Sequence, residues 1–144
     1  MVHHEDFPGL EVTVQIAGSP AVEYEDDEEI EVAPSPAGAH QAARTVSRYI
    51  EAVTGAEFSI KASLSRDFKW DSPVIEVGLT VDGNWISGVI IHSKPNAEES
   101  TEIKGVHQPP APGGRSRQWA LKKLQFAQLE ISKHRGWLEK NVSY

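Results

Sequence analysis

The sequence of 144 residues contains no cysteine. This absence excludes disulfide scaffolds, thiolate zinc sites and cysteine nucleophiles, and it fits an intracellular protein. No apolar run approaches the roughly 18 residues that a transmembrane helix needs. Residues 1–7 have neither the basic start nor the apolar segment of a secretory signal. We therefore expect a soluble, intracellular protein, cytoplasmic or nuclear, with no membrane partner.

Motifs of catalysis and cofactor binding are also lacking. The chain has no Gly-x-Ser-x-Gly elbow, and Gly113-Gly114 lacks the strand, lysine and helix of a phosphate-binding loop. None of the six histidines stands in a metal-ligand spacing with another histidine or a carboxylate. Glu57 and Glu76 could form a carboxylate pair of the glycosidase kind, but outward-facing carboxylates on strands are normally solvated. We predict a protein that is not an enzyme, with no cofactor and no metal.

Charge is unevenly distributed along the chain. Residues 23–31 hold seven carboxylates, which equals the net charge of −7 of the whole chain. From Arg115 onward the sign reverses, with seven lysines and arginines against two glutamates. This asymmetry favours head-to-tail or self-complementary association, or docking on a partner of one sign. The overall pI of about 5.3 argues against binding to nucleic acid.

The clearest structural pattern is a β-hairpin over residues 73–92. Before Asp82-Gly83, a dipeptide that supplies the positive-φ turn of a hairpin, a period of two places Ile75, Val77, Leu79 and Val81 on one face. Both faces are largely apolar, which predicts a central position in a sheet. On the return strand, the two faces are expected to carry Ile86 and Ile90 on one side, and Trp85, Val89 and Ile91 on the other.

Further strands are predicted over residues 10–16, 22–24, 44–53, 56–64, 100–108 and 118–131. In the first of them, Leu10, Val12, Val14 and Ile16 are expected to point inward. Residues 44–53 also fit a helical stripe, but their β-branched and aromatic content favours a strand, which could pair with residues 56–64 through Thr54-Gly55. Residues 118–131 are expected to form a strand with a bulge at Lys122-Lys123, and a helix over 119–133 is the alternative.

Seven or eight short strands with turn signals between them predict an all-β fold, an antiparallel β-sandwich. A jelly-roll or immunoglobulin-like topology and a short C-terminal helix both stay open. We expect a single domain over residues 1–144, with an acidic loop at 23–31 and flexible loops at 33–42 and 108–117. Trp137-Leu138 could pack on the core or dock on a neighbouring molecule.

Several short motifs carry a family resemblance. They are Tyr49-Ile-Glu-Ala-Val-Thr-Gly-Ala-Glu-Phe58, Phe68-Lys-Trp70, Val81-Asp-Gly83, Gly88-Val89, Trp119, Lys123-Leu-Gln-Phe126 and Leu129. In order and spacing, from about Leu10 to Leu129, the chain resembles an uncharacterised domain family common in filamentous fungi. The resemblance implies strands in these segments, including residues 44–53, and it implies no activity and no catalytic residue.

The functional hypothesis is a non-enzymatic module for protein interaction or self-association. The residues expected to bind a partner are Glu25, Asp26, Asp27, Glu28, Glu29, Lys122 and Lys123. One alternative is a carbohydrate-binding module that uses Trp70 and Trp85 as an aromatic platform. The other is an acidic module that binds basic proteins such as histones. A solvated loop is the simplest interpretation of the acidic run, and calcium is disfavoured because the run has no turn glycine.

Overall fold

The computed structural model describes residues 4, 6–28, 30, 32–94, 96–113 and 118–128. Over these residues the chain forms ten strands and one short helix, and every strand pair is antiparallel. The prediction of an all-β fold is confirmed. The elements are β1 (Leu10–Ile16), β2 (Ser19–Pro20), β3 (Glu23–Glu25), α1 (Pro36–Ala42), β4 (Arg48–Ile50), β5 (Glu57–Leu64), β6 (Val74–Val81), β7 (Asn84–His92), β8 (Glu99–Ile103), β9 (Gly105–Gln108) and β10 (Ala120–Gln125).

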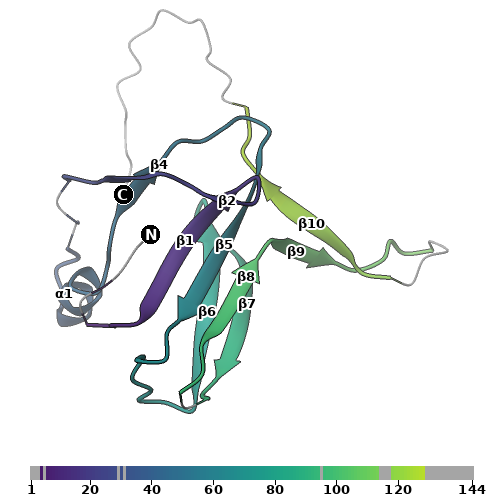
Figure 1. The fold of residues 1–144 in the computed structure, drawn as a ribbon. Coiled ribbons are helices and arrows are strands. Elements are labelled where there is room, and N and C mark those ends of the chain that lie inside the picture. Colours follow the sequence, from purple (N-terminus) through teal and green to yellow (C-terminus); the bar gives the residue numbers. More distant parts are fainter. Residues whose placement is uncertain are drawn as a thin grey trace, which may run out of the picture.

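The largest sheet is built around β5. β1 pairs along one edge of β5, and the other edge is shared by β8 and by the last two residues of β10. β2 continues β1 through a turn at Ala17-Gly18, where φ is 50° and 83° as a two-residue hairpin turn requires. Among the described residues, β10 is the strand that pairs with β9, and the two strands project from the sheet as an arm in Figure 1. We call β9 and β10 the arm.

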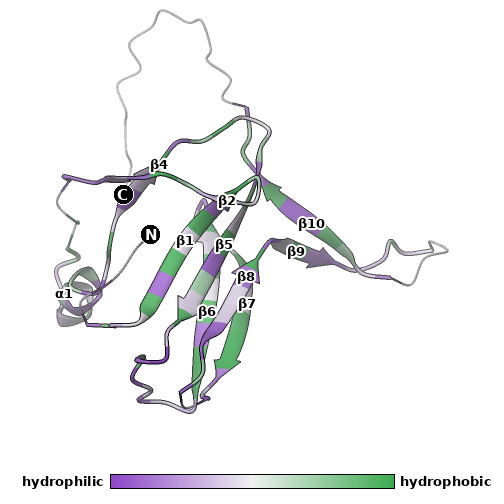
Figure 2. Cartoon of the chain, viewed as in Figure 1, coloured by the Kyte–Doolittle hydropathy of each residue, from purple (hydrophilic) through white to green (hydrophobic). Residues whose placement is uncertain are grey.

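The register between β1 and β5 brings the apolar side chains of both strands to one face. Val12 lies opposite Ala62 and Val14 lies opposite Ile60, so the alternation predicted for β1 is confirmed. Figure 2 shows the same alternation as bands of opposite hydropathy along these two strands. Thr13 and Ser59 belong to the opposite, polar face, yet both are buried. Neighbouring polar side chains cover them, and Ser59 donates a hydrogen bond of 2.6 Å to Glu102.

The hydrophobic core is small. Among the described residues, the buried apolar side chains are Ala62, Leu64, Ile91 and Ile103, from β5, β7 and β8. Their positions agree with the contact that β7 makes with β8. A second apolar contact joins the main sheet to the base of the arm, because the rings of Phe58 and Phe126 stack with centroids 4.5 Å apart. The arm is therefore anchored at its base.

β6 and β7 form the predicted hairpin around Asp82-Gly83, whose φ angles are 49° and 75°. The expected central position is wrong for the described part of the chain, because the two strands form a separate two-stranded sheet. The expected faces of β7 are also wrong near the turn. A register shift between Leu79 and Thr80 places one extra residue on β7. This bulge turns Trp85 to the face opposite the one that Ile91 occupies.

Two loop-and-strand predictions between β3 and β5 need correction. Residues 48–50 do form a strand, β4, but it pairs with β3 and not with β5. The reason is that the connection at Gly55 is bonded elsewhere, since its amide donates to the Phe126 carbonyl. The expected flexible loop at 33–42 contains helix α1. Ser35 caps this helix by accepting a hydrogen bond from the Gly38 amide, and Pro36 starts it with a φ suited to a helix.

Residues 120–125 form strand β10, so the strand prediction holds there and the helical alternative is wrong. At the place of the expected bulge, β10 instead changes partner, from β9 at Lys123 to β5 at Leu124. Within the loop expected at 108–117, Gln108 ends β9 and residues 114–117 lie outside the described residues, as does Trp137-Leu138.

The sandwich arrangement and its topology stay predictions. Among the described residues, no helix has the length and apolarity needed to cross a membrane.

Candidate interaction surfaces

The acidic segment begins as a strand and is held by β4. Glu25 lies opposite Arg48 in the β3–β4 pair. Asp26 follows, and its carboxylate accepts a hydrogen bond from the Ser47 hydroxyl and another of 3.0 Å from the Glu28 amide. The expected acidic loop at 23–31 is therefore ordered at its start, because β4 supplies backbone partners and Ser47, just before β4, supplies a side-chain donor.

Hydrogen bonding changes the electrostatics of this segment. The Ser47 hydroxyl, and after it the Glu28 amide, hold the pKa of Asp26 below its ordinary value of 3.8. The negative charge of Asp26, and after it that of Glu28, raises the pKa of the Tyr49 phenol above 10.0. Asp26 is thus a structural carboxylate that joins β3 to β4, and it is less available to a partner than its neighbours are.

The structure does not bring the expected partner-binding residues into one site. Asp27 and Glu28 are exposed beside β3, and Glu29 lies outside the described residues. Lys122 and Lys123 belong to β10, on the other side of the β1–β5 pair from β4 in Figure 1. Lys123 forms an ion pair of 2.6 Å with Glu57 in the same chain. The acidic and basic groups therefore cannot serve one common ligand, and each set belongs to a different surface.

A third surface lies on the outer face of the β6–β7 hairpin. Gly78 and Gly88 are directly paired across the two strands. A Cβ atom on Gly78 would lie 2.5 Å from two carbons of the Trp85 indole, and one on Gly88 would lie 2.8 Å from a third. The indole therefore covers this bare glycine pair, as aromatic side chains do over glycines in sheets. Trp85 stays 61% exposed, and Ile90 on the same face is 60% exposed.

Trp85 belongs to the aromatic platform of the carbohydrate-binding alternative, but the predicted alternation of β7 placed its side chain on the face of Ile91, which is wrong. The signal that could have corrected this is the pair of glycines at positions 78 and 88. An isolated glycine inside a strand marks a bulge or a close approach by another group. Here one glycine lies on each strand of the predicted hairpin, four residues before Asp82 and five residues after Gly83. This difference of one residue fits a bulge that brings the two glycines opposite each other under a large side chain.

The edge of β6 is a second feature of the hairpin that the sequence analysis missed. β7 is the one strand that pairs with β6 within the described ranges. At the base of the hairpin the Ser93 amide donates to the Pro73 carbonyl over 2.9 Å, so residue 73 faces β7. Because antiparallel pairing alternates, every second residue then directs its backbone N–H and C=O to the open edge. These residues are Val74, Glu76, Gly78 and Thr80.

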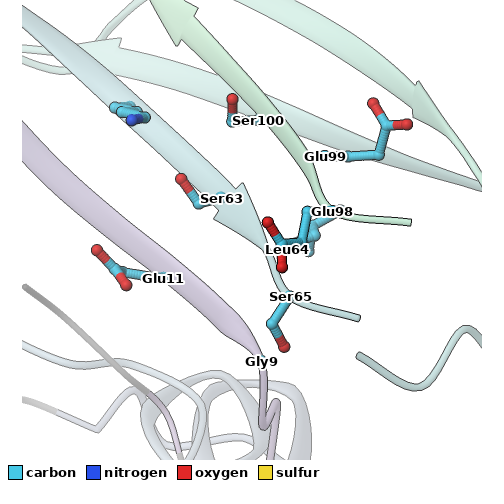
Figure 3. Close-up of a pocket in the computed structure, with 9 residues that line it drawn as sticks. Gly9, Glu11, Ser63, Leu64, Ser65, Glu98, Glu99 and Ser100 are labelled. Carbon is cyan, nitrogen blue, oxygen red and sulfur yellow. The ribbon is translucent and has the colours of Figure 1, made fainter. Parts of the chain in front are cut away.

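A polar groove of about 560 Å³ lies across β1, β5 and the start of β8. Figure 3 shows Glu11, Ser63 and Ser100 from three neighbouring strands along this groove. Two of its three carboxylates hold ion pairs, Glu98 with Arg66 at 3.3 Å and Glu99 with Lys94 at 2.8 Å. The groove is thus a polar sheet face whose charges are largely compensated. In the part of the chain that the structure describes, no group of three or more histidines and carboxylates is placed to hold a metal ion.

A family model described as a domain of unknown function, DUF7918, matches residues 9–141. The chain belongs to the DUF7918 family. The match begins just before β1 and ends after β10, so this DUF7918 domain includes the main sheet, the hairpin and the arm. Comparison with curated proteins and with solved structures found no match.

Proposed function

We propose that this DUF7918 domain is a non-enzymatic protein-interaction module, and that the β6–β7 hairpin is its recognition element. The observation that carries the proposal is the open edge of β6. An unpaired strand edge offers backbone donors and acceptors to an extended segment of another protein, which adds as a further strand. Such binding needs no catalytic residues and no deep pocket.

The composition of β6 strengthens this argument. Edge strands in stable proteins are usually protected by lysine, proline, a bulge or short length. β6 is eight residues long, and its sequence VIEVGLTV has neither lysine nor proline. The bulge of this hairpin adds its extra residue to β7 and leaves β6 regular. An unprotected edge of this length is a hazard for aggregation unless a partner covers it, which favours a functional interpretation.

The outer face of the hairpin adds side-chain contacts to the backbone contacts. A strand that pairs with β6 places every second side chain beside Gly78 and Glu76, on the face where the Trp85 indole lies. Exposed tryptophan is enriched among the residues that contribute most to protein interfaces. The hairpin therefore offers backbone pairing for affinity and a tryptophan for selectivity.

Capture of binding partners from a cell extract, followed by mass spectrometry, tests the proposal. Glu76→Pro removes one backbone N–H from the open edge, whereas Glu76→Gln removes the charge and keeps that N–H. We expect the proline variant to lose partners that both the glutamine variant and the wild type retain. Circular dichroism should show that both variants keep their strand content. Equal capture by all three proteins would refute the proposed role of the edge.

Trp85 also supports carbohydrate binding as a second candidate function. One face of its indole covers the glycine pair, and its large exposed fraction leaves room for a sugar ring to stack. Trp70, the other tryptophan of the expected platform, is half-buried and packs edge-on against Phe68 at 5.4 Å. A glycan array would test this candidate. Binding that Trp85→Ala abolishes would favour it over strand addition, and an array without signal would refute it.

The remaining expectations from sequence stay proposals. An acidic module for basic proteins such as histones predicts that neutralising Glu25–Glu29 abolishes the capture of such proteins. Asp26 counts against a large effect from its own position, because it is engaged with Ser47. A location in the cytoplasm or nucleus and a family distribution centred on filamentous fungi also stay predictions.

A further inference from the structure

Two stretches of the chain have opposite and unmixed charge. Residues 70–93 contain three carboxylates and no lysine or arginine, and they form the β6–β7 hairpin. Residues 103–128 contain five lysines and arginines and no carboxylate, and they include the arm. Within the elements themselves, the hairpin carries Glu76 and Asp82, and the arm carries Lys122 and Lys123. Lys123 is paired with Glu57 of its own chain, so Lys122 is the main contribution of the arm to an attraction between the two elements.

The arm exposes apolar side chains as well as positive charge. Trp119, just before β10, is 64% exposed, and Leu121 is 41% exposed. These two residues and Lys123 are two apart in sequence, so they share one face of an extended strand. The hairpin offers the matching apolar pair, Trp85 and Ile90, on its outer face. Arm and hairpin are therefore complementary in charge and alike in apolar exposure.

Both elements also have an unpaired edge. Over residues 120–123, β10 pairs with β9 along one edge, and no strand among the described residues pairs along the other. Likewise, no strand in the described ranges pairs with β6 along the edge opposite β7. Within one molecule the arm contacts the hairpin through β9 and β7, whereas the two open edges belong to β10 and β6, which do not pair with each other among the described residues. Two molecules can bring them together.

We propose that the arm of one molecule adds to the β6 edge of a second copy of this chain. β10 pairs with β6, and Trp119 and Leu121 of one copy pack on Trp85 and Ile90 of the other. This inference rests on the proposed function, since it uses the same edge, and it names the partner as the chain itself. The two surfaces differ, so the contact is heterologous, and each added copy leaves one free arm and one free hairpin.

The test is analytical ultracentrifugation of the full-length chain over a range of concentrations. We expect the average mass to rise with concentration above that of the monomer, because each copy has one arm and one hairpin edge with which to bind further copies. Raising the salt concentration should weaken assembly, because it screens the attraction between hairpin and arm. A monomer at every concentration and salt level would overturn the inference.

Two variants sharpen the test. Glu76→Pro blocks the hairpin edge and leaves the arm intact, whereas Leu121→Asp alters the arm and leaves the hairpin intact. We expect each variant alone to dissociate at least about tenfold more readily than the wild type, since each loses one half of every contact. An equimolar mixture should form dimers and nothing larger, because one functional arm meets one functional hairpin.

The outcomes separate this inference from the proposed function. If the mixture stays monomeric while each variant is folded by circular dichroism, the pairing of arm with hairpin is wrong. If the wild type is monomeric but captures other proteins in a way that Glu76→Pro abolishes, the hairpin binds a foreign segment, and only the second-copy inference fails. If neither assembly nor hairpin-dependent capture is seen, both fail. Larger assemblies that both variants form equally well would point to another surface and also overturn the inference.

Discussion

Replacing Gly105 by alanine should detach the arm. Gly105 is the first residue of β9, and a Cβ atom there would lie 2.0 Å from the Lys122 carbonyl oxygen of β10. Because real Cβ contacts essentially never fall below 3.0 Å, β10 must move by at least about 1 Å. The obstacle is backbone, so no rotation of a side chain can relieve it. The hydrogen bond of 3.1 Å from the Leu124 amide to the Lys104 carbonyl would then exceed hydrogen-bonding distance.

The size of the effect follows from these contacts. One or two lost backbone hydrogen bonds cost about 1–1.5 kcal/mol each, and the residual overlap adds about 1 kcal/mol or more. We therefore expect Gly105→Ala to lower the free energy of unfolding by about 2–4 kcal/mol. At roughly 3–4 °C per kcal/mol for a chain of this size, the melting temperature should fall by about 6–16 °C. Differential scanning calorimetry measures this change.

Gly18→Ala is the matched control for this prediction. Gly18 has a φ of +83° and no atom within 4 Å of a built Cβ, so alanine there meets backbone strain alone. That strain costs roughly 1–2 kcal/mol. Gly105 lies outside the left-handed region, so its alanine variant meets the clash alone. If Gly105→Ala proves no more destabilising than Gly18→Ala, the close approach of β9 and β10 is not what requires a glycine.

Three further predictions concern single contacts. Gly78→Ala should destabilise the wild type by about 0.5–1.5 kcal/mol, because the new methyl group clashes with the Trp85 indole. In a Trp85→Ala background this cost should disappear. Equal costs in the two backgrounds, measured by urea unfolding, would contradict the stacking of the indole on Gly78. Ser47→Ala should raise the pKa of Asp26 toward 3.8, as carboxyl NMR titration can measure. The pKa of Asp26 is lower in the folded than in the unfolded protein. The stability that Ser47 contributes is therefore present above pH 3.8 and is lost as the pH falls through the lowered pKa. If the free energies of unfolding of variant and wild type still differ in strong acid, this hydrogen bond to the carboxylate is not the cause. Lys123→Ala should lower the free energy of unfolding by less than about 1 kcal/mol, because the ion pair of Lys123 with Glu57 is more than half exposed. A larger decrease, measured by denaturant unfolding, would mean that Lys123 supports the base of the arm in another way.

The alternation of side chains in the sequence was sufficient to predict where most strands form. It was insufficient to predict which strands pair with each other. The period of two in β1 and β5 defines an apolar and a polar face for each strand, and the observed register agrees with both. β4 shows the limit, because its three residues could pair with either neighbour in sequence. The choice of β3 depends on contacts that are distant in sequence, such as the bond from Ser47 to Asp26 and the bond from Gly55 to Phe126.

For the candidate surfaces too, the sequence identified unusual residues but not their contacts. The sequence identified the acidic run, the paired lysines and Trp85 as candidates, because charge density and the positions of tryptophans can be read directly from it. It could not show that Asp26 is engaged by Ser47 or that Lys123 is engaged by Glu57. It also could not show that β6 keeps an open edge, because an edge is defined by which strands fail to pair, and pairing is a property of the whole fold.

The sequence by itself determined the all-β class, the hairpin at Asp82-Gly83 and the separation of acidic from basic segments, because these depend on side-chain period, turn chemistry and charge within short stretches. The tertiary structure alone decided which face Trp85 occupies, where β10 changes partner and which edges stay open. A single bulge moves every side chain near it to the other face of a strand, and its position depends on the partner strand.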